Sequence, residues 1–151
     1  MNPKRKLLWL LPLSITLFAF ANSSLSGEQS TMISSSFLQY VLQLFQSFFS
    51  NIPIEHLHLV IRKTAHFAEY TALGFSMFFA DYYQEYQFLN KKSILFFLFI
   101  IPILDESIQL YTSGRSFQIT DMFIDWIGII FGFILFLLLY KLFLKKRNQT
   151  F

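Results

Sequence analysis

Four apolar segments dominate this chain and limit what it can fold into. They cover about residues 5–22, 62–81, 93–111 and 121–142, and each is close to the roughly 20 residues that a helix needs to cross a bilayer. Hydrophobic residues make up 54% of the chain and charged residues only 14%, against about 25% charged residues in soluble domains. The sequence therefore predicts an all-α, polytopic membrane helix bundle of four spans, forming one domain over residues 1–151.

The first segment allows two interpretations. A basic head, an apolar centre and Ala19-Phe20-Ala21 before Asn22 are typical of a secretory signal peptide, which would be cleaved after residue 21. The other interpretation is a retained first span, which we favour because three further apolar segments follow. In both cases Asn22 is expected outside the cytoplasm.

An additional amphipathic helix is predicted over about residues 36–50. Leu and Phe residues recur there at helical spacing on one side, while Gln and Ser residues without any charge form the other side. We expect it to lie on the outer interface or to pack over the bundle. The Ser-rich stretch over residues 23–36 that precedes it is predicted to be a loop.

The positions of the basic residues predict the topology. Nine of the 12 Lys and Arg residues lie in the cytoplasm if four spans place both termini there, as the positive-inside rule prefers. The other three are Arg62, Lys63 and Arg115, and all of them fall on the outer side. Because they oppose the topological preference, we expect another role to keep them there.

A cluster of polar side chains is predicted where three helices meet the outer face. Its members are Arg62, Lys63, His66, Glu69, Tyr70, Asp105, Glu106, Gln109, Arg115, Asp121 and Asp125. Many follow the i, i+4, i+7 spacing that places side chains on one helix face, and Gly128-x-x-x-Gly132 would draw the last helix close to its neighbours. Since an ionisable group facing the bilayer centre costs about 2.5–3.5 kcal/mol, these residues should face inward and pair with one another.

The chemistry of the cluster leaves alternatives open. It is either an ion-pair network that holds the helices in register, or a site in which Arg62, Lys63 and Arg115 bind an anionic head group. In such a site His66, beside Glu69 and Asp105, could transfer a proton. No phosphatase motif with a second paired His is present.

Metal binding is a further alternative for the acidic side chains of the cluster. They are Asp105, Glu106, Asp121 and Asp125. No dedicated ligand spacing is present among them, so the sequence assigns neither a metal nor a cofactor.

Two sequence blocks in the cluster resemble motifs of the VanZ-like family. Arg62-Lys63-Thr64-Ala65-His66-Phe67-Ala68-Glu69-Tyr70 with Leu73-Gly74 resembles R-K-x-x-H-F-x-E-Y-x-x-L-G. Asp105-Glu106-Ser107-Ile108-Gln109, Gly114-Arg115, Asp121 and Gly128 resemble D-E-x-x-Q…G-R…D…G. The resemblance extends over about residues 5–140, but Asp125 stands where the family usually has Asn.

This resemblance implies a small protein of the bacterial cytoplasmic membrane, with about four spans and a retained first helix. It links the chain to the cell envelope and to susceptibility to the glycopeptide teicoplanin, without implying a reaction. We expect a protein that engages an anionic envelope lipid, glycolipid, cell-wall precursor or glycopeptide from outside, with no nucleic acid as partner. The alternatives are an enzyme acting on a lipid-linked phosphate and a purely structural membrane protein, and a homo-oligomer is compatible with either.

Overall fold

The structure, a computed structural model, describes residues 7–49, 54–83 and 90–144, and all regular elements in these ranges are helices. In chain order they are η1 (Leu7–Trp9), α2 (Leu10–Ser23), α3 (Gly27–Phe49), α4 (Ile54–Tyr83), α5 (Lys91–Leu110), α6 (Ile119–Leu139) and η2 (Tyr140–Leu144). The all-α prediction is thus confirmed for these ranges. The basic head at residues 4–6 and the basic tail at residues 145–147 lie outside them.

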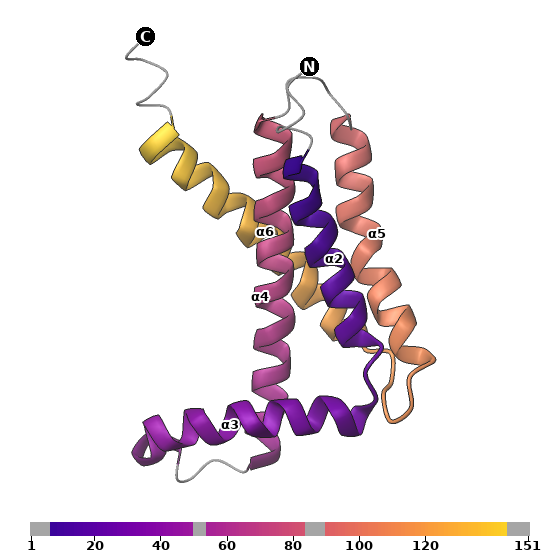
Figure 1. The fold of residues 1–151 in the computed structure, drawn as a ribbon, viewed down its shortest axis with the longest axis vertical. Helices are drawn as coiled ribbons and strands as arrows, with labels where there is room; N and C mark the ends of the chain where they lie inside the picture. Colours follow the sequence, from indigo (N-terminus) through magenta and orange to yellow (C-terminus); the bar gives the residue numbers. More distant parts are fainter. Residues whose placement is uncertain (1–6, 50–53, 84–89, 145–151) are drawn as a thin grey trace.

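The long helices run lengthwise between two ends of the molecule, as Figure 1 shows. Helices α2, α4 and α5 lie alongside one another, while α6 starts among them and tilts away towards its C-terminal end. Helix α3 lies across the end opposite the two termini, because the chain bends by 110° between α2 and α3. We call the end covered by α3 the α3 end.

The helices expose a large apolar surface, which is typical of a membrane protein. Among the described residues, Lys91–Leu110 and Ile119–Leu142 are long and apolar enough to cross a bilayer, and a third span results if Leu7–Ser23 and Gly27–Phe37 count as one bent span. Many large apolar side chains of α5 and α6, such as Phe96 and Ile130, are exposed, as suits a lipid-facing surface. Helix α4 is not among these spans, since polar residues lower its hydropathy.

Helices α4 and α6 approach one another closely at three glycines. A Cβ atom on Gly132 would lie 2.1 Å from the backbone oxygen of Thr71, and one on Gly128 would lie 2.8 Å from that of Phe67. On α4, a Cβ on Gly74 would meet the backbone oxygen of Ile129 at 2.4 Å. The close approach predicted from the Gly128-x-x-x-Gly132 spacing is therefore confirmed.

A buried apolar core lies beside this contact and joins α4 to α5 and α6. It consists of Tyr70, Leu73, Met77, Ile94, Leu98, Ile101 and Ile129. At its edge the Trp126 ring stacks on that of Phe99 at 5.1 Å, and Trp126 Nε1 donates to the Phe99 backbone oxygen. The core fixes the rotation of the three helices that carry the polar cluster.

Helix α3 begins well before the start predicted near residue 36, so the loop predicted for residues 23–36 is wrong from Gly27 onward. Ser26 and Gln29 form a capping box, in which the Gln29 amide donates to Ser26 Oγ and the Ser26 amide to Gln29 Oε1. Several Ser and Thr hydroxyls that follow, including that of Ser35, donate to backbone oxygens of the preceding turn. Serine-rich composition therefore does not exclude a helix here.

Candidate functional site

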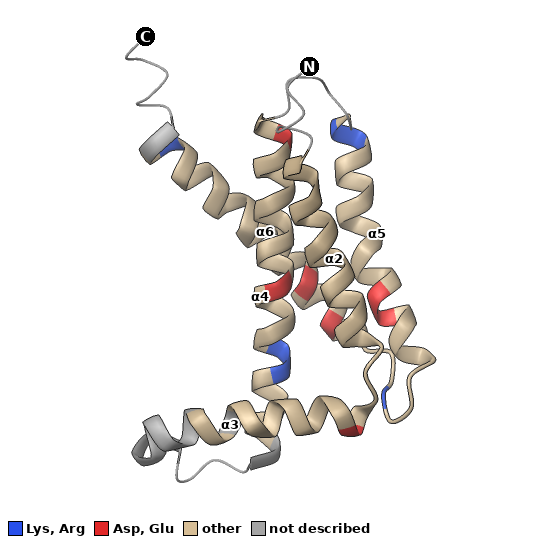
Figure 2. Ribbon diagram, viewed as in Figure 1, with Lys and Arg blue, Asp and Glu red and all other residues tan. Residues whose placement is uncertain are grey.

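Acidic residues are concentrated in the half of the bundle nearer α3, as the red ribbon segments in Figure 2 show. The acidic residues there are Glu69 on α4, Asp105 and Glu106 on α5, and Asp121 and Asp125 on α6. We call these five, with Arg62, Lys63, His66, Tyr70, Gln109 and Arg115, the polar cluster. Four of the five carboxylates are at most 1% exposed, a degree of burial that acidic groups rarely reach without partners. Their partners differ from one carboxylate to the next.

Asp121 is paired with two basic residues of α4. Its Oδ1 forms an ion pair with Lys63 Nζ, and its Oδ2 lies 3.5 Å from Arg62 Nη2. Asp121 is also in the first turn of α6, where the helix dipole favours a negative charge. These contacts connect α4 to the beginning of α6 and match the inward pairing expected from the sequence.

Glu106 is satisfied without any basic residue. Gln109 Nε2 donates to its Oε1 at 2.7 Å, and the backbone amide of Gln118 donates to its Oε2 at 2.9 Å. Both carboxylate oxygens thereby have a partner, which compensates part of the cost of complete burial. The second of these bonds connects the last turns of α5 to the residue before α6.

Glu69 obtains its partner from the end of α2. Asn22 Nδ2 donates to Glu69 Oε1 at 2.7 Å, and the adjacent Ser23 is buried, with its backbone oxygen accepting from Thr112 Oγ1. Sequence reasoning did not assign Asn22 or Ser23 to the cluster. Their polarity directly after an apolar run was the available indication.

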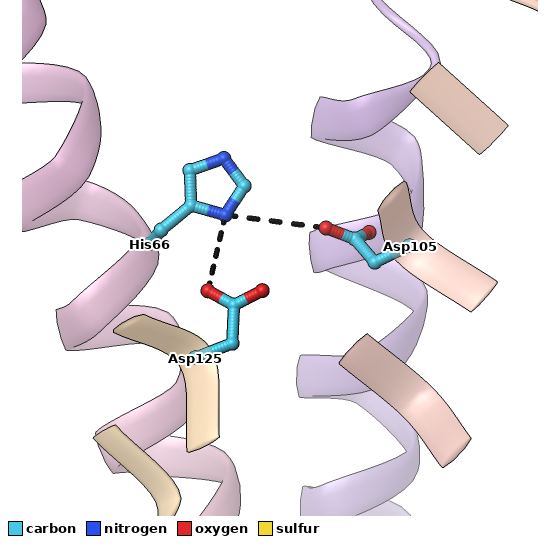
Figure 3. Close-up of side chains that lie close together, drawn as sticks. All are labelled: His66, Asp105 and Asp125. Carbon is cyan, nitrogen blue, oxygen red and sulfur yellow. Dashed lines mark ion pairs between the residues drawn. The ribbon is translucent and has the colours of Figure 1, made fainter. Parts of the chain in front are cut away.

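The centre of the cluster is formed by His66, Asp105 and Asp125, one residue from each of α4, α5 and α6 (Figure 3). His66 Nδ1 lies 3.4 Å from Asp125 Oδ1 and 4.0 Å from Asp105 Oδ2. The hydroxyls of Ser23 and Tyr70 are near Asp105, but neither completes a hydrogen bond with it. We call these three residues the central triad.

Arg115 lies between α5 and α6, where it interacts electrostatically with Asp105, Glu106 and Asp121 without an ion pair to any of them. Its side chain is half-buried, it forms no ion pair with a described residue, and its Nε has no hydrogen-bond partner among them. Burial and the neighbouring Arg62 lower the pKa of the Arg115 guanidinium, but an arginine stays charged at neutral pH. Arg115 is therefore available to an anion from outside.

A cleft of about 570 Å³ opens at the α3 end between α3, the first turns of α4 and the segment before α6. Its polar lining comes from Glu28, Ser30, Thr31, Ser34 and Ser35 on α3, His58 and Arg62 on α4, and Gln118. His58 Nδ1 lies 3.2 Å from Ser34 Oγ across the cleft. Of the predicted residues only Arg62 lines this cleft, and the sequence analysis missed the rest because the cleft exists only once α3 folds back across the bundle.

One wall of the cleft is fixed by a contact between two glycines. The Gly27 amide donates to the Ser113 backbone oxygen at 2.9 Å, and a Cβ on Gly27 would lie 2.3 Å from the Gly114 oxygen. Gly114 has φ +74°, a left-handed conformation that favours glycine. The start of α3 is thus held against the segment that carries Arg115.

The structure brings all eleven predicted residues to one region, in distinct roles. Arg62 and Lys63 pair with Asp121, Gln109 serves Glu106, and Tyr70 belongs to the buried core. No curated protein and no solved structure matches this chain significantly. The family model described as VanZ/LLP1 matches residues 7–140, which include every residue of the polar cluster, and the chain belongs to this family.

Proposed function

We propose that this protein is a multi-pass protein of the bacterial cytoplasmic membrane that binds the phosphate-bearing head group of an envelope lipid or lipid-linked cell-wall precursor at its outer face. Binding such a head group would alter the access of other molecules, glycopeptide antibiotics such as teicoplanin included, to cell-wall precursors. The observation that carries this proposal is a cleft lined by serine and threonine side chains, Glu28 and Arg62, with Arg115 nearby, which forms no ion pair with a described residue.

The chemistry of the cleft suits a phosphate. Arginine presents several N–H groups in a planar fork that matches phosphate oxygens. The hydroxyl groups of Thr31, Ser34 and Ser35 donate to backbone oxygens, so their oxygens can accept hydrogen bonds from the hydroxyls of a glycerol or sugar. Arg62 keeps N–H groups for such a ligand, because Asp121 forms its closer ion pair with Lys63. The distance from Asp121 Oδ2 to Arg62 Nη2 is 3.5 Å. Buried Nε atoms of Arg62 and Arg115 also lack partners among the described residues.

The distribution of charge supports an outward-facing cleft. Lys91 and Lys92 begin α5 and Lys141 follows α6, and Figure 2 shows these two helix ends opposite α3. Arg62, next to Lys63, lines the cleft beside α3, and Arg115 follows Gly114, which contacts the start of α3. Under the positive-inside rule the end that carries Lys91, Lys92 and Lys141 faces the cytoplasm. Four crossings by α2, α4, α5 and α6 then place both termini inside, and α3 along the outer interface.

The packing of α2 favours its retention rather than its removal as a signal peptide. Ala19 and Ser23 are buried against the bundle, and Asn22 donates a hydrogen bond to Glu69. Loss of residues 1–21 would expose the surfaces of α4 and α5 that α2 covers. The mass of the mature protein tests this directly, because a cleaved chain would lack those residues.

Binding is favoured over catalysis by the place of the histidines. His66, which sequence reasoning considered as an acid–base group, belongs to the buried central triad and does not line the cleft. His58 does line it, but its partner is a serine hydroxyl rather than a carboxylate. The one carboxylate of the described lining, that of Glu28, is not a recorded partner of His58, so no carboxylate is seen to orient or activate this histidine as a general base.

Lipid binding by the purified protein tests the proposal. We expect short-chain phosphatidylglycerol and undecaprenyl phosphate to bind in preference to phosphatidylcholine, as measured by native mass spectrometry. Arg62→Gln and Arg115→Gln should each weaken that binding by roughly tenfold or more, because charge-assisted hydrogen bonds contribute about 1.5–3 kcal/mol. Lys92→Gln, at the opposite end of the molecule, is the matched control and should bind as the parent does.

Two outcomes would overturn the proposal. Equal affinity for the anionic and zwitterionic lipids would show that the arginines do not recognise the head group. Parental affinity in both arginine variants would mean that the polar cluster is only an ion-pair network. Release of phosphate from undecaprenyl phosphate would show an enzyme instead of a binder.

The orientation is tested separately by labelling. The chain has no Cys, so Ser24→Cys and Ser113→Cys introduce single reporters next to the α3 end. An impermeant thiol reagent should label both in whole cells but not Lys92→Cys. Protection of the first two would place this end in the cytoplasm.

A further inference from the structure

The central triad has the composition and arrangement of a metal-ligand set. His66, Asp105 and Asp125 come from three different helices, and one ligand atom from each lies within 4.8 Å of the others. We propose that these three residues bind one divalent first-row transition-metal ion, with Zn²⁺ as the reference ion, between α4, α5 and α6. This proposal is independent of the lipid-binding function proposed above.

The unsatisfied atoms of the triad point to a ligand. Asp105 and Asp125 are 0% exposed and His66 is 8% exposed. All four carboxylate oxygens and His66 Nδ1 are buried without a hydrogen-bond partner in the described part of the chain. Buried polar groups in proteins are nearly always partnered, and an uncompensated buried charge costs several kcal/mol. Figure 3 shows the atoms turned towards one another.

The charge balance of the polar cluster points to a cation. Lys63 and Arg62 both pair with Asp121, and Arg115 forms no ion pair with a described residue. Among the described residues no Lys or Arg therefore pairs with Asp105 or Asp125, whose only basic neighbour within 4.0 Å is His66. His66 can carry at most one positive charge. A divalent ion would compensate both carboxylates at once.

The distances and ligand types favour a transition metal. Two ligand atoms bound tetrahedrally at roughly 2.0–2.1 Å are about 3.4 Å apart, and His66 Nδ1 lies 3.4 Å from Asp125 Oδ1. Asp105 Oδ2 lies 4.0 Å from His66 Nδ1, so its side chain would have to move closer when the ion binds. One imidazole with two carboxylates suits Zn²⁺ or Mn²⁺ better than Mg²⁺ or Ca²⁺, which prefer oxygen ligands alone.

The surroundings of the triad also suit a metal site. The Tyr70 and Ser23 hydroxyls beside Asp105 could orient its carboxylate, as outer groups orient metal ligands in other proteins. Three protein ligands leave a coordination position for water or another small ligand. The sequence alone could not predict this set, because no fixed spacing relates residues that meet through the packing of three helices.

Metal binding by the full-length protein in detergent tests the proposal. After treatment with a chelator, the wild-type protein should take up about one Zn²⁺ per chain by elemental analysis, and Zn²⁺ should raise its Tm, since a ligand that binds only the folded state stabilises it. His66→Gln, Asp105→Asn and Asp125→Asn should each weaken Zn²⁺ binding by at least about tenfold. Asp81→Asn, which changes a carboxylate near the other end of α4, is the matched control and should bind Zn²⁺ as the parent does.

A second measurement keeps the test decisive if a variant folds poorly. Asp125→Asn removes an uncompensated buried charge, so without metal its Tm should equal or exceed that of the wild type, and Zn²⁺ should no longer raise it. A structural ion pair predicts the reverse, a lower Tm in the variant with or without metal. That result would overturn the proposal, as would absence of Zn²⁺ and Mn²⁺ binding in the wild type. Equal Zn²⁺ binding in all three triad variants would place the ion elsewhere, for example at His56 and His58, and would also overturn it.

Discussion

Helix α4 packs against α6 in two different ways along its length. Near the α3 end the two helices meet through ionisable side chains, with Arg62 and Lys63 paired to Asp121. Further along they meet through backbone, at Gly74, Gly128 and Gly132. Between membrane helices, close packing of small residues is sufficient for association. The ionisable contacts therefore add to an association that the glycine contact already provides.

The largest effect is expected where the backbones touch. In Gly132→Leu the new side chain would start 2.1 Å from the Thr71 backbone oxygen, and because backbone cannot move aside the helices must separate. We expect the free energy of unfolding to fall by about 3 kcal/mol, as measured by reversible unfolding in mixed detergent micelles. Ile130→Leu, at a side chain that faces outward, is the control and should stay within about 0.5 kcal/mol of the parent. Equal stability of the two variants would show that the glycine contact is not tight.

A smaller effect is expected at the ionisable contact. Asp121→Asn removes the negative charge shared by Lys63 and Arg62, and should lower the free energy of unfolding by about 2 kcal/mol. The value is moderate because Lys63 and Arg62 are partly exposed to solvent. The same unfolding measurement applies.

A double-mutant cycle shows whether the pair itself is responsible. Once Lys63→Gln is present, Asp121→Asn should cost about 1 kcal/mol less than it does alone. Additive effects of the two substitutions would mean that the Lys63–Asp121 pair contributes nothing to stability. The polar contact would then be dispensable for folding, and the contrast with the glycine contact would be sharper.

The sequence predicted best what depends on short stretches of chain. The approximate places of the helices follow from hydropathy and helical spacing. The gathering of Arg62, Asp105 and Asp121 at one end of the bundle followed from combining their positions in each helix with the expected topology. The Gly128-x-x-x-Gly132 contact was also foreseen, because a helix keeps residues four apart on one face.

The sequence did not predict what depends on how the helices are rotated and bent. His66 meets Asp105 and Asp125 only because the core around Tyr70 fixes three helices in register. Asn22 reaches Glu69 only because α2 lies against α4. The early start of α3 was missed for another reason. The Ser26–Gln29 capping box is a local sequence pattern, but the serine-rich composition of this stretch was interpreted as a loop.

The smallest effect is expected at that capping box. Ser26→Ala removes the oxygen that accepts from the Gln29 amide, and should weaken the first turn of α3 by about 1 kcal/mol. Because this turn lies beside the cleft and outside the apolar core, the loss should remain local, and hydrogen exchange should accelerate at the first amides of α3 but not in α4 or α6. Ser36→Ala, which removes a hydroxyl that donates to the Met32 backbone oxygen within the helix, should leave those amides unchanged. Faster exchange throughout the bundle would instead mean that α3 is part of the same cooperative unit as the α4–α6 contact. The cleft could then not open or close around a head group without loosening the helices beneath it.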